Sequence, residues 1–237
     1  MARVRNAQLL TLMLDAVLVE WENVLVDTGS VRRDALVRAF AEEGLEFDAA
    51  RWTADCLGRP LHGAIAFALA HTGRTDDTLT DLLVLRAGRA FAERLGKGFV
   101  LVPGAREFLE RLQVGTTLCI VSSSTRAETD FVLRLAGLDA MVSTITCAEA
   151  TEQPGATYDR AITHLAERQQ VRRHRMVAVA HVAPALRGAR VAGIRTVAVG
   201  APAHEALEAD GAVRSIEGVT LPDLARIVGL ITPECLS

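Results

Sequence analysis

Lysine and aromatic residues are scarce in this sequence. Of the 26 basic residues only Lys97 is a lysine, so the other 25 are arginines. Any mechanism that requires a lysine must therefore use Lys97. The 2 tryptophans, 1 tyrosine and 7 phenylalanines leave the core to be built mainly from Ala, Val, Leu and Ile. The 237 residues are enough for one large domain, or for a core with a small inserted domain.

Cysteine pairs, a strong charge of one sign and long apolar runs are also missing. The four cysteines have no C-x-x-C spacing, which argues against a zinc site or a disulfide framework. The formal net charge of −3 argues against a nucleic-acid binder driven by bulk charge. No run reaches the ~18 apolar residues of a membrane span, and Asp15 interrupts the apolar start of the chain without a cleavage site following it. We therefore expect a cytoplasmic protein with no membrane and no nucleic-acid partner.

Short apolar runs alternate with helical stretches along much of the chain. The runs are Ala16–Val19 (AVLV), Thr117–Val121 (TLCIV), Met176–Val179 (MVAV) and Thr196–Val199 (TVAV). This alternation predicts an α/β fold with a Rossmann-like parallel sheet and helices on both faces. Ligands of such sheets bind beyond the carboxyl ends of the strands, so the residues that directly follow each run are the candidates for chemistry.

One long segment, from about Ser30 to Leu95, breaks the alternation and predicts consecutive helices. The predicted helices are Val31–Glu43, Ala49–Cys56, Leu61–His71 and Leu79–Leu95. A helical block inserted after the first strand predicts a cap over the strand ends. We therefore assign residues 1–28 and 103–237 to the α/β core and residues 29–102 to an α-helical cap.

The segment Leu18–Thr28, LVEWENVLVDT, resembles the first motif of the haloacid dehalogenase superfamily, hhhDxDGxxxDT. The helical insert, Pro103-Gly104, the strand end IVSSS and the segment MVAVAHVAPALRGARVAGIRTVAVG follow in the order of that family. The resemblance covers about the whole chain and is greatest for the helical-cap branch, which contains phosphoglycolate phosphatases and β-phosphoglucomutases. It implies the same core and cap, with the reactive site at the strand ends.

The first motif has glutamates where the family has aspartates. The nucleophilic aspartate corresponds to Glu20, the acid–base aspartate two residues on corresponds to Glu22, and the glycine that follows corresponds to Asn23. Glutamate is one methylene longer, and in-line attack on phosphorus requires reacting atoms about 3–3.5 Å apart. Asparagine tolerates a left-handed backbone better than most residues, so Asn23 is compatible with the turn that the family glycine makes.

The later motifs also differ from those of the family. By the resemblance, Gln153 replaces the lysine that neutralises the phosphoryl group, and Ala180-His181 replaces the acidic pair that holds magnesium. Ser122, which matches the phosphoryl-binding serine or threonine, is unchanged. Mg²⁺ prefers oxygen ligands, which Ala180 lacks. We expect no cofactor to be required, and Glu20 and Glu22 are the ligands if Mg²⁺ binds.

Three functions follow from these residues. In the first, the chain is a pseudoenzyme that binds a small molecule or a partner protein in the core–cap cleft. In the second, it is a divergent hydrolase or a non-phosphoryl enzyme. In the third, it is a structural or assembly protein, such as a homodimer formed through the apolar cap helix Leu61–Ala70.

The candidate site residues divide into two groups. The candidate catalytic residues are Glu20, Glu22 and His181, of which His181 could carry a proton near neutral pH. The candidate ligand or anion contacts are Ser122, Ser123, Asn23, Gln153, Arg59 and His62. The run Ser122–Ser124 could equally cap the helix that follows it.

Overall fold

The computed structural model describes residues 14–51, 56, 58–150, 152, 155–200 and 206–231. Its main element is a six-stranded sheet with the order β5-β4-β1-β6-β7-β8, in which every neighbouring pair is parallel. The strands are β1 (Ala16–Glu20), β4 (Thr117–Ser122), β5 (Thr144–Cys147), β6 (Met176–Ala180), β7 (Arg195–Val199) and β8 (Gly211–Val213). The predicted α/β fold class is therefore confirmed.

Two of these strands were not among the predicted runs. β5 and β8 lie at the two edges of the sheet, and neither contains a fully buried residue. The four predicted runs correspond to β1, β4, β6 and β7, which lie inside the sheet and are almost entirely buried. A long apolar run is the mark of a strand covered on both faces, so the edge strands leave a weaker signal in the sequence.

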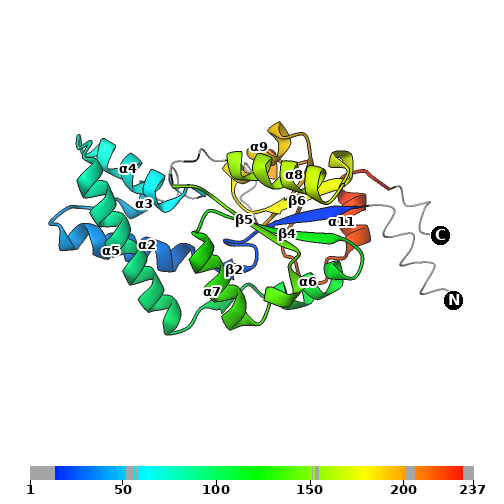
Figure 1. Ribbon diagram of the computed structural model, residues 1–237, viewed down its shortest axis with the longest axis horizontal. Coiled ribbons are helices and arrows are strands. Elements are labelled where there is room, and N and C mark those ends of the chain that lie inside the picture. The colour runs from blue at the N-terminus through cyan, green and yellow to red at the C-terminus, as the bar shows by residue number, and fades with distance from the viewer. Residues whose placement is uncertain are drawn as a thin grey trace.

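Helices cover both faces of the sheet (Figure 1). Helices α6 (Ala105–Gln113), α7 (Arg126–Ala136) and α11 (Leu221–Ile227) pack in one hydrophobic cluster, and α8 (Ala156–Arg168) and α9 (Ala183–Val191) pack in another. The β1 side chains alternate between the clusters: Val17 and Val19 belong to the first, Ala16 and Leu18 to the second. Two 3₁₀ turns, η2 (Asp139–Met141) and η3 (Arg173–Arg175), precede β5 and β6.

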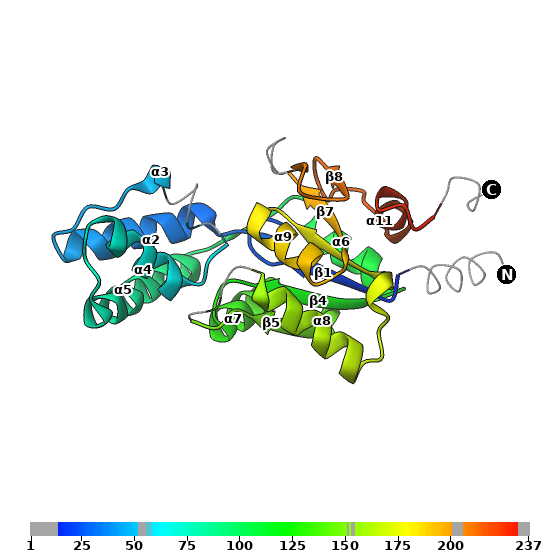
Figure 2. The same cartoon turned by 90° about the horizontal axis from the view of Figure 1, so that it is seen from above.

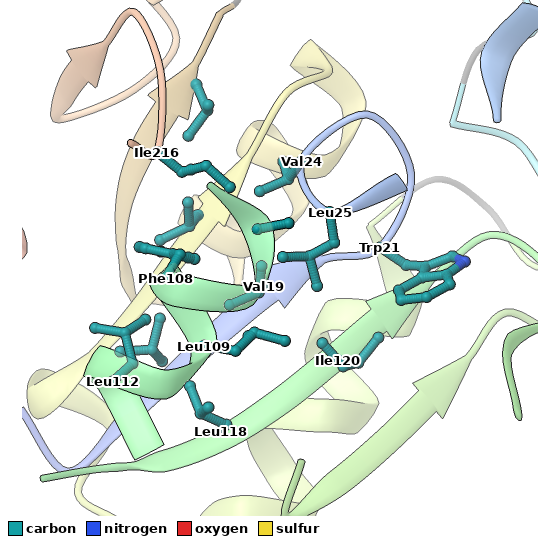
Figure 3. Close-up of a cluster of buried hydrophobic side chains, with 14 of the residues drawn as sticks. Val19, Trp21, Val24, Leu25, Phe108, Leu109, Leu112, Leu118, Ile120 and Ile216 are labelled. Carbon is teal, nitrogen blue, oxygen red and sulfur yellow. The ribbon is translucent and has the colours of Figure 1, made fainter. Parts of the chain in front are cut away.

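Trp21, the residue after β1, is anchored in the first cluster. It is 1% exposed, and Figure 3 shows it with Val19, Ile120 and the α6 side chains Phe108 and Leu109. Because strand side chains alternate in direction, burying Val19 and Trp21 on one face directs Glu20 and Glu22 away from that cluster. The turn then closes at Asn23, whose φ of 63° is left-handed, as its place in the motif predicts.

The cap lies to one side of the sheet as a separate helical lobe (Figure 2). Its helices are α2 (Gly29–Glu42), α3 (Ala49–Arg51), α4 (Leu61–His71) and α5 (Asp77–Gly96), and they bury a third hydrophobic cluster of their own. The predicted helix Ala49–Cys56 is described only as α3 and at Cys56, since residues 52–55 lie outside the described part of the chain.

A two-stranded antiparallel ribbon joins the cap to the core. Its strands are β2 (Val26–Asp27) and β3 (Val100–Leu101). The predicted borders at residues 28/29 and 102/103 come just after these two strands, and the division into domains stays a prediction. Within the described residues, none of the helices combines the length and apolar character needed to cross a membrane.

Candidate functional site

The candidate site lies where the carboxyl ends of the central strands meet. Glu20 ends β1, Ser122 ends β4 and Ala180 ends β6, and β1 lies between the other two strands. From β1 the sheet continues through β4 to β5 on one side and through β6 and β7 to β8 on the other. Open parallel sheets form their ligand sites where the strand order changes direction in this way. The sheet therefore brings together Glu20, Glu22, Ser122, Ser123 and His181, although they come from three distant parts of the sequence.

The carboxylate of Glu22 is enclosed by the loop that follows β4. Its Oε1 accepts hydrogen bonds from Ser122 Oγ (2.9 Å), Ser124 N (2.9 Å) and Ser124 Oγ (2.7 Å), and its Oε2 accepts from Ser123 N (3.2 Å). The residue is only 7% exposed. We call these four donors, two hydroxyls and two backbone amides, the serine cradle. In this structure the anion in the serine cradle is a side chain of the protein itself.

Neighbouring side chains hold the serine cradle in place. Thr129 Oγ1 donates to Ser122 Oγ (3.1 Å), and Arg32 Nη2 donates to Ser124 Oγ (2.6 Å). The helix that follows, α7, is capped by Thr125 in a capping box with Glu128. The side chains of Ser122, Ser123 and Ser124 therefore do not cap α7, because the side chain of Thr125 does.

The carboxylate of Glu20 is turned toward β6 and α9. Its Oε2 accepts hydrogen bonds from the backbone amides of His181 (2.6 Å) and Val182 (3.3 Å), and Glu20 is 5% exposed. Val182 is the N-cap residue of α9 and its own side chain makes no capping hydrogen bond. Glu20 therefore satisfies two amides at the start of α9, in the way that a capping side chain does.

His181 contributes its backbone to Glu20, but its ring faces another strand. Its Nδ1 lies 2.9 Å from the carbonyl oxygen of Val199 at the end of β7. A carbonyl oxygen only accepts, so Nδ1 carries the proton and donates it. In the part of the chain that the structure describes, the ring hydrogen bond goes to β7 and not to either glutamate.

The other predicted contacts are divided between the site and the cap. Arg59 and Asn23 line a cavity with Glu20 and Glu22, and the Arg59 guanidinium lies 4.8 Å from the centre of the Phe67 ring. His62 Nε2 instead lies 3.6 Å from Asp81 Oδ1, which places it between α4 and α5. Gln153 lies outside the described residues.

The space left at the site is small. The cavity between Glu20, Glu22, Arg32, Arg59 and Ser123 has a volume of about 10 Å³, roughly that of one water. A second cavity, which Glu20 also lines together with Ser122, Ser123 and Tyr158 among others, has a volume of about 30 Å³. Both cavities at the site are therefore too small for a ligand much larger than water in this arrangement of side chains.

Two functional candidates were missed from the sequence, Arg32 and Tyr158. Arg32 is 5% exposed, pairs with Glu128 (3.6 Å) and stacks over the Phe91 ring (4.2 Å). Arg32 lies on the buried face of α2, between apolar residues, where an arginine is unexpected. Its place in that apolar pattern is the feature of the sequence that could have identified it. Tyr158 is buried beside the glutamates, and burial, reinforced by the charges of Glu20 and Glu22, raises the pKa of its phenol well above the ordinary value.

Comparison with known families identifies the chain. Residues 22–199 match the model of the family described as haloacid dehalogenase-like hydrolase, and the chain belongs to this family. This confirms the family that the order of the motifs in the sequence predicts, and the match begins at Glu22, after Glu20. No curated protein sequence matches the chain significantly.

Solved structures with the same fold cover nearly the whole chain. CbbY from Rhodobacter sphaeroides in complex with phosphate aligns with a TM-score of 0.76 at 21% identity, over 90% of this chain and 99% of that one. A β-phosphoglucomutase from Clostridium difficile aligns with a TM-score of 0.78 at 14% identity, over 92% and 98%. A predicted phosphoglycolate phosphatase from Haemophilus somnus aligns with a TM-score of 0.72 at 15% identity, over 86% and 95%. At these identities the likeness establishes the fold.

The residues present do not fit the Mg²⁺ ion that the family resemblance implies. The Glu22 oxygens already accept four hydrogen bonds, and Glu20 Oε2 accepts two backbone amides. Ala180 offers no side-chain ligand, and the His181 ring bonds Val199. Among the described residues, no group of three or more His, Cys, Asp or Glu side chains is arranged to hold a metal. We therefore derive no chemical step through a metal.

Proposed function

We propose that this protein is a pseudoenzyme of the haloacid dehalogenase-like family, which keeps the fold and the cleft for binding and lacks aspartyl-phosphate chemistry. The observation that supports it is the position of the Glu22 carboxylate. It accepts hydrogen bonds from all four donors of the serine cradle. These donors belong to the loop that in this family binds the phosphoryl group.

Phosphoryl transfer depends on positioning and on positive charge around the transferring group. With Glu22 in the serine cradle, a phosphoryl group meets a buried negative charge at the place where it needs hydrogen-bond donors. Glu20 would have to give up the amides of His181 and Val182 before it could attack phosphorus. Both requirements raise the barrier for the family reaction.

The cleft still has features that suit binding. The guanidiniums of Arg32 and Arg59 line it together with the hydroxyl-bearing residues Thr28 and Ser123. We propose that the ligand, a small molecule or a partner segment, is anionic and enters when the cap moves away from the core. The apolar side of α4 is used inside the cap, where Ala64, Ile65 and Leu69 are buried. A homodimer through α4 therefore has less apolar surface available than the sequence suggested, and it stays a prediction.

The test is turnover of a broad panel of phosphate esters with Mg²⁺ by the wild type and by Glu20→Gln, purified identically. We expect no turnover above that of Glu20→Gln, because Glu20 is held by backbone amides and Glu22 fills the cradle. A contaminating phosphatase would give equal rates in both proteins, so the variant controls for it. Turnover that the wild type shows and Glu20→Gln lacks would contradict the proposal and support the divergent hydrolase, with Glu20 as nucleophile or base.

A further inference from the structure

The serine cradle is an anion-binding site that already contains an anion. Two hydroxyls and two amides converge on one carboxylate, at donor–acceptor distances of 2.7–3.2 Å. Hydrogen bonds to an ionised oxygen are the strong ones in proteins. A cradle with this donor set would otherwise leave buried donors unpaired, which is costly.

We propose that Glu22 is a built-in competitor for this site, and that the serine cradle together with Arg32 binds an external oxyanion of the phosphate type once the Glu22 carboxylate leaves. The proposal rests on the proposed function in assuming that the site binds rather than turns over its ligand. It assigns Glu22 a regulatory role, because the affinity for the ligand depends on where this one side chain lies.

Arg32 supplies independent evidence for a ligand larger than a carboxylate. Its side chain is buried, yet its Nε has no hydrogen-bond partner among the described residues, and neither has the buried Thr28 Oγ1. Both residues line the cavity beside Glu22 and Ser123. Glu22 accepts hydrogen bonds from the cradle donors but not from Arg32 Nε or Thr28 Oγ1. A tetrahedral oxyanion in the cradle has further oxygens that can accept from them.

A tethered carboxylate is a strong competitor. Glu22 is held next to the cradle by the chain, so its effective concentration there is high. An external anion must both displace it and remain close to its negative charge. The wild type should therefore bind phosphate weakly, and removal of the carboxylate should raise the affinity by about tenfold or more.

The experiment measures binding of inorganic phosphate by calorimetry at constant ionic strength, for the wild type, Glu22→Ala, Glu22→Gln and Glu149→Ala. We expect Glu22→Ala to bind at least about tenfold more tightly than the wild type and Glu22→Gln to lie between them, since glutamine keeps the size but loses the charge. Glu149→Ala is the matched control. It removes an exposed carboxylate from the loop after β5, outside the cavity, and leaves Glu22 in the cradle, so its affinity should stay close to that of the wild type.

Three results would overturn the inference. One is an unchanged, wild-type affinity for phosphate in both Glu22 variants. Another is an equal gain of affinity in Glu149→Ala, which would indicate a general effect of charge. The third is phosphate binding to Glu22→Ala without a shift of the amide resonances of Ser123 and Ser124, which would show that the phosphate lies outside the serine cradle. Turnover by the wild type would contradict the proposed function alone, because these binding measurements are independent of it.

Discussion

The carboxylates of Glu20 and Glu22 both accept hydrogen bonds from neighbouring loops. Both side chains extend from the end of β1 to neighbouring loops, Glu20 to the start of α9 and Glu22 to the serine cradle. Both are almost fully buried, and their hydrogen bonds compensate for the loss of water. At the scale of the residue, the two glutamates therefore act as structural anions in this conformation.

Replacing Glu20 by alanine tests this structural role. The amides of His181 and Val182 would lose their acceptor at a buried helix start, so we expect Glu20→Ala to lower the free energy of unfolding by about 2 kcal/mol. Urea denaturation followed by circular dichroism measures it. Glu167→Ala, at an exposed glutamate of α8, is the control and should stay within about 0.5 kcal/mol of the wild type. Equal stability of both variants would show that Glu20 does not cap α9.

The elements meet at the site because of the strand order and because of one close contact between two helices. Gly155, the N-cap residue of α8, lies against Gly188 inside α9: a Cβ added to Gly188 would lie 2.1 Å from the Cα of Gly155. Two backbones can come this close only where both residues are glycine, because neither has a Cβ. It draws α8 and α9 together. Helix α8 carries Tyr158, and the two amides that donate to Glu20, those of His181 and Val182, directly precede α9.

The contact between Gly155 and Gly188 predicts that replacing glycine by alanine changes stability in opposite directions in α9 and in α5. Gly188→Ala should lower the free energy of unfolding by about 2 kcal/mol or more, because the added methyl group collides with backbone and the helices must separate. Gly88→Ala, inside α5, has no atom within 4 Å of the added Cβ and should raise the free energy of unfolding by about 0.5–1 kcal/mol through helix propensity. Thermal and urea unfolding of the two variants measure both effects. A stabilised Gly188→Ala would show that the helices are not in this contact.

At the scale of the whole molecule, the two lobes share one of the three hydrophobic clusters. One cluster lies on the α8–α9 face of the sheet and one inside the cap, whereas the cluster on the α6 face also contains Val31, Ala35, Phe91 and Leu95 of the cap helices. Tyr158 belongs to the α8–α9 face and is the only tyrosine of the chain. Its titration therefore reports on the integrity of the fold near the glutamates.

The raised pKa of Tyr158 predicts alkaline unfolding. In the unfolded chain the phenol ionises near pH 10.0, whereas in the folded protein burial and the two glutamates keep it protonated at that pH. Above about pH 10 the unfolded state releases a proton that the folded state retains, so stability falls as the pH rises further. Tyrosinate absorbance and far-ultraviolet circular dichroism should therefore change together. Ionisation of Tyr158 in a protein that keeps its native circular dichroism would contradict the burial of this phenol.

Much of the fold could be predicted from the sequence because it depends on local patterns. The apolar runs at β1, β4, β6 and β7 and the helical block of the cap are visible in the periodicity, and the motif order indicates the family. The edge strands β5 and β8 were missed because half-buried residues give no long apolar run. The predicted site residues Glu20, Glu22, Ser122, Ser123 and His181 do meet, since parallel strands bring their ends to one edge.

The sequence by itself determined which residues stand at the motif positions, and so the expectation that family chemistry is altered. Only the tertiary structure decided what those residues contact. Glu22 meets Ser122 and Ser124 across 100 and 102 positions of the chain, and Glu20 meets the His181 amide across 161. Arg32 reaches Ser124 from the cap, across 92 positions. Hydrogen bonds over such separations depend on how strands and helices pack, and no local spacing in the sequence encodes them.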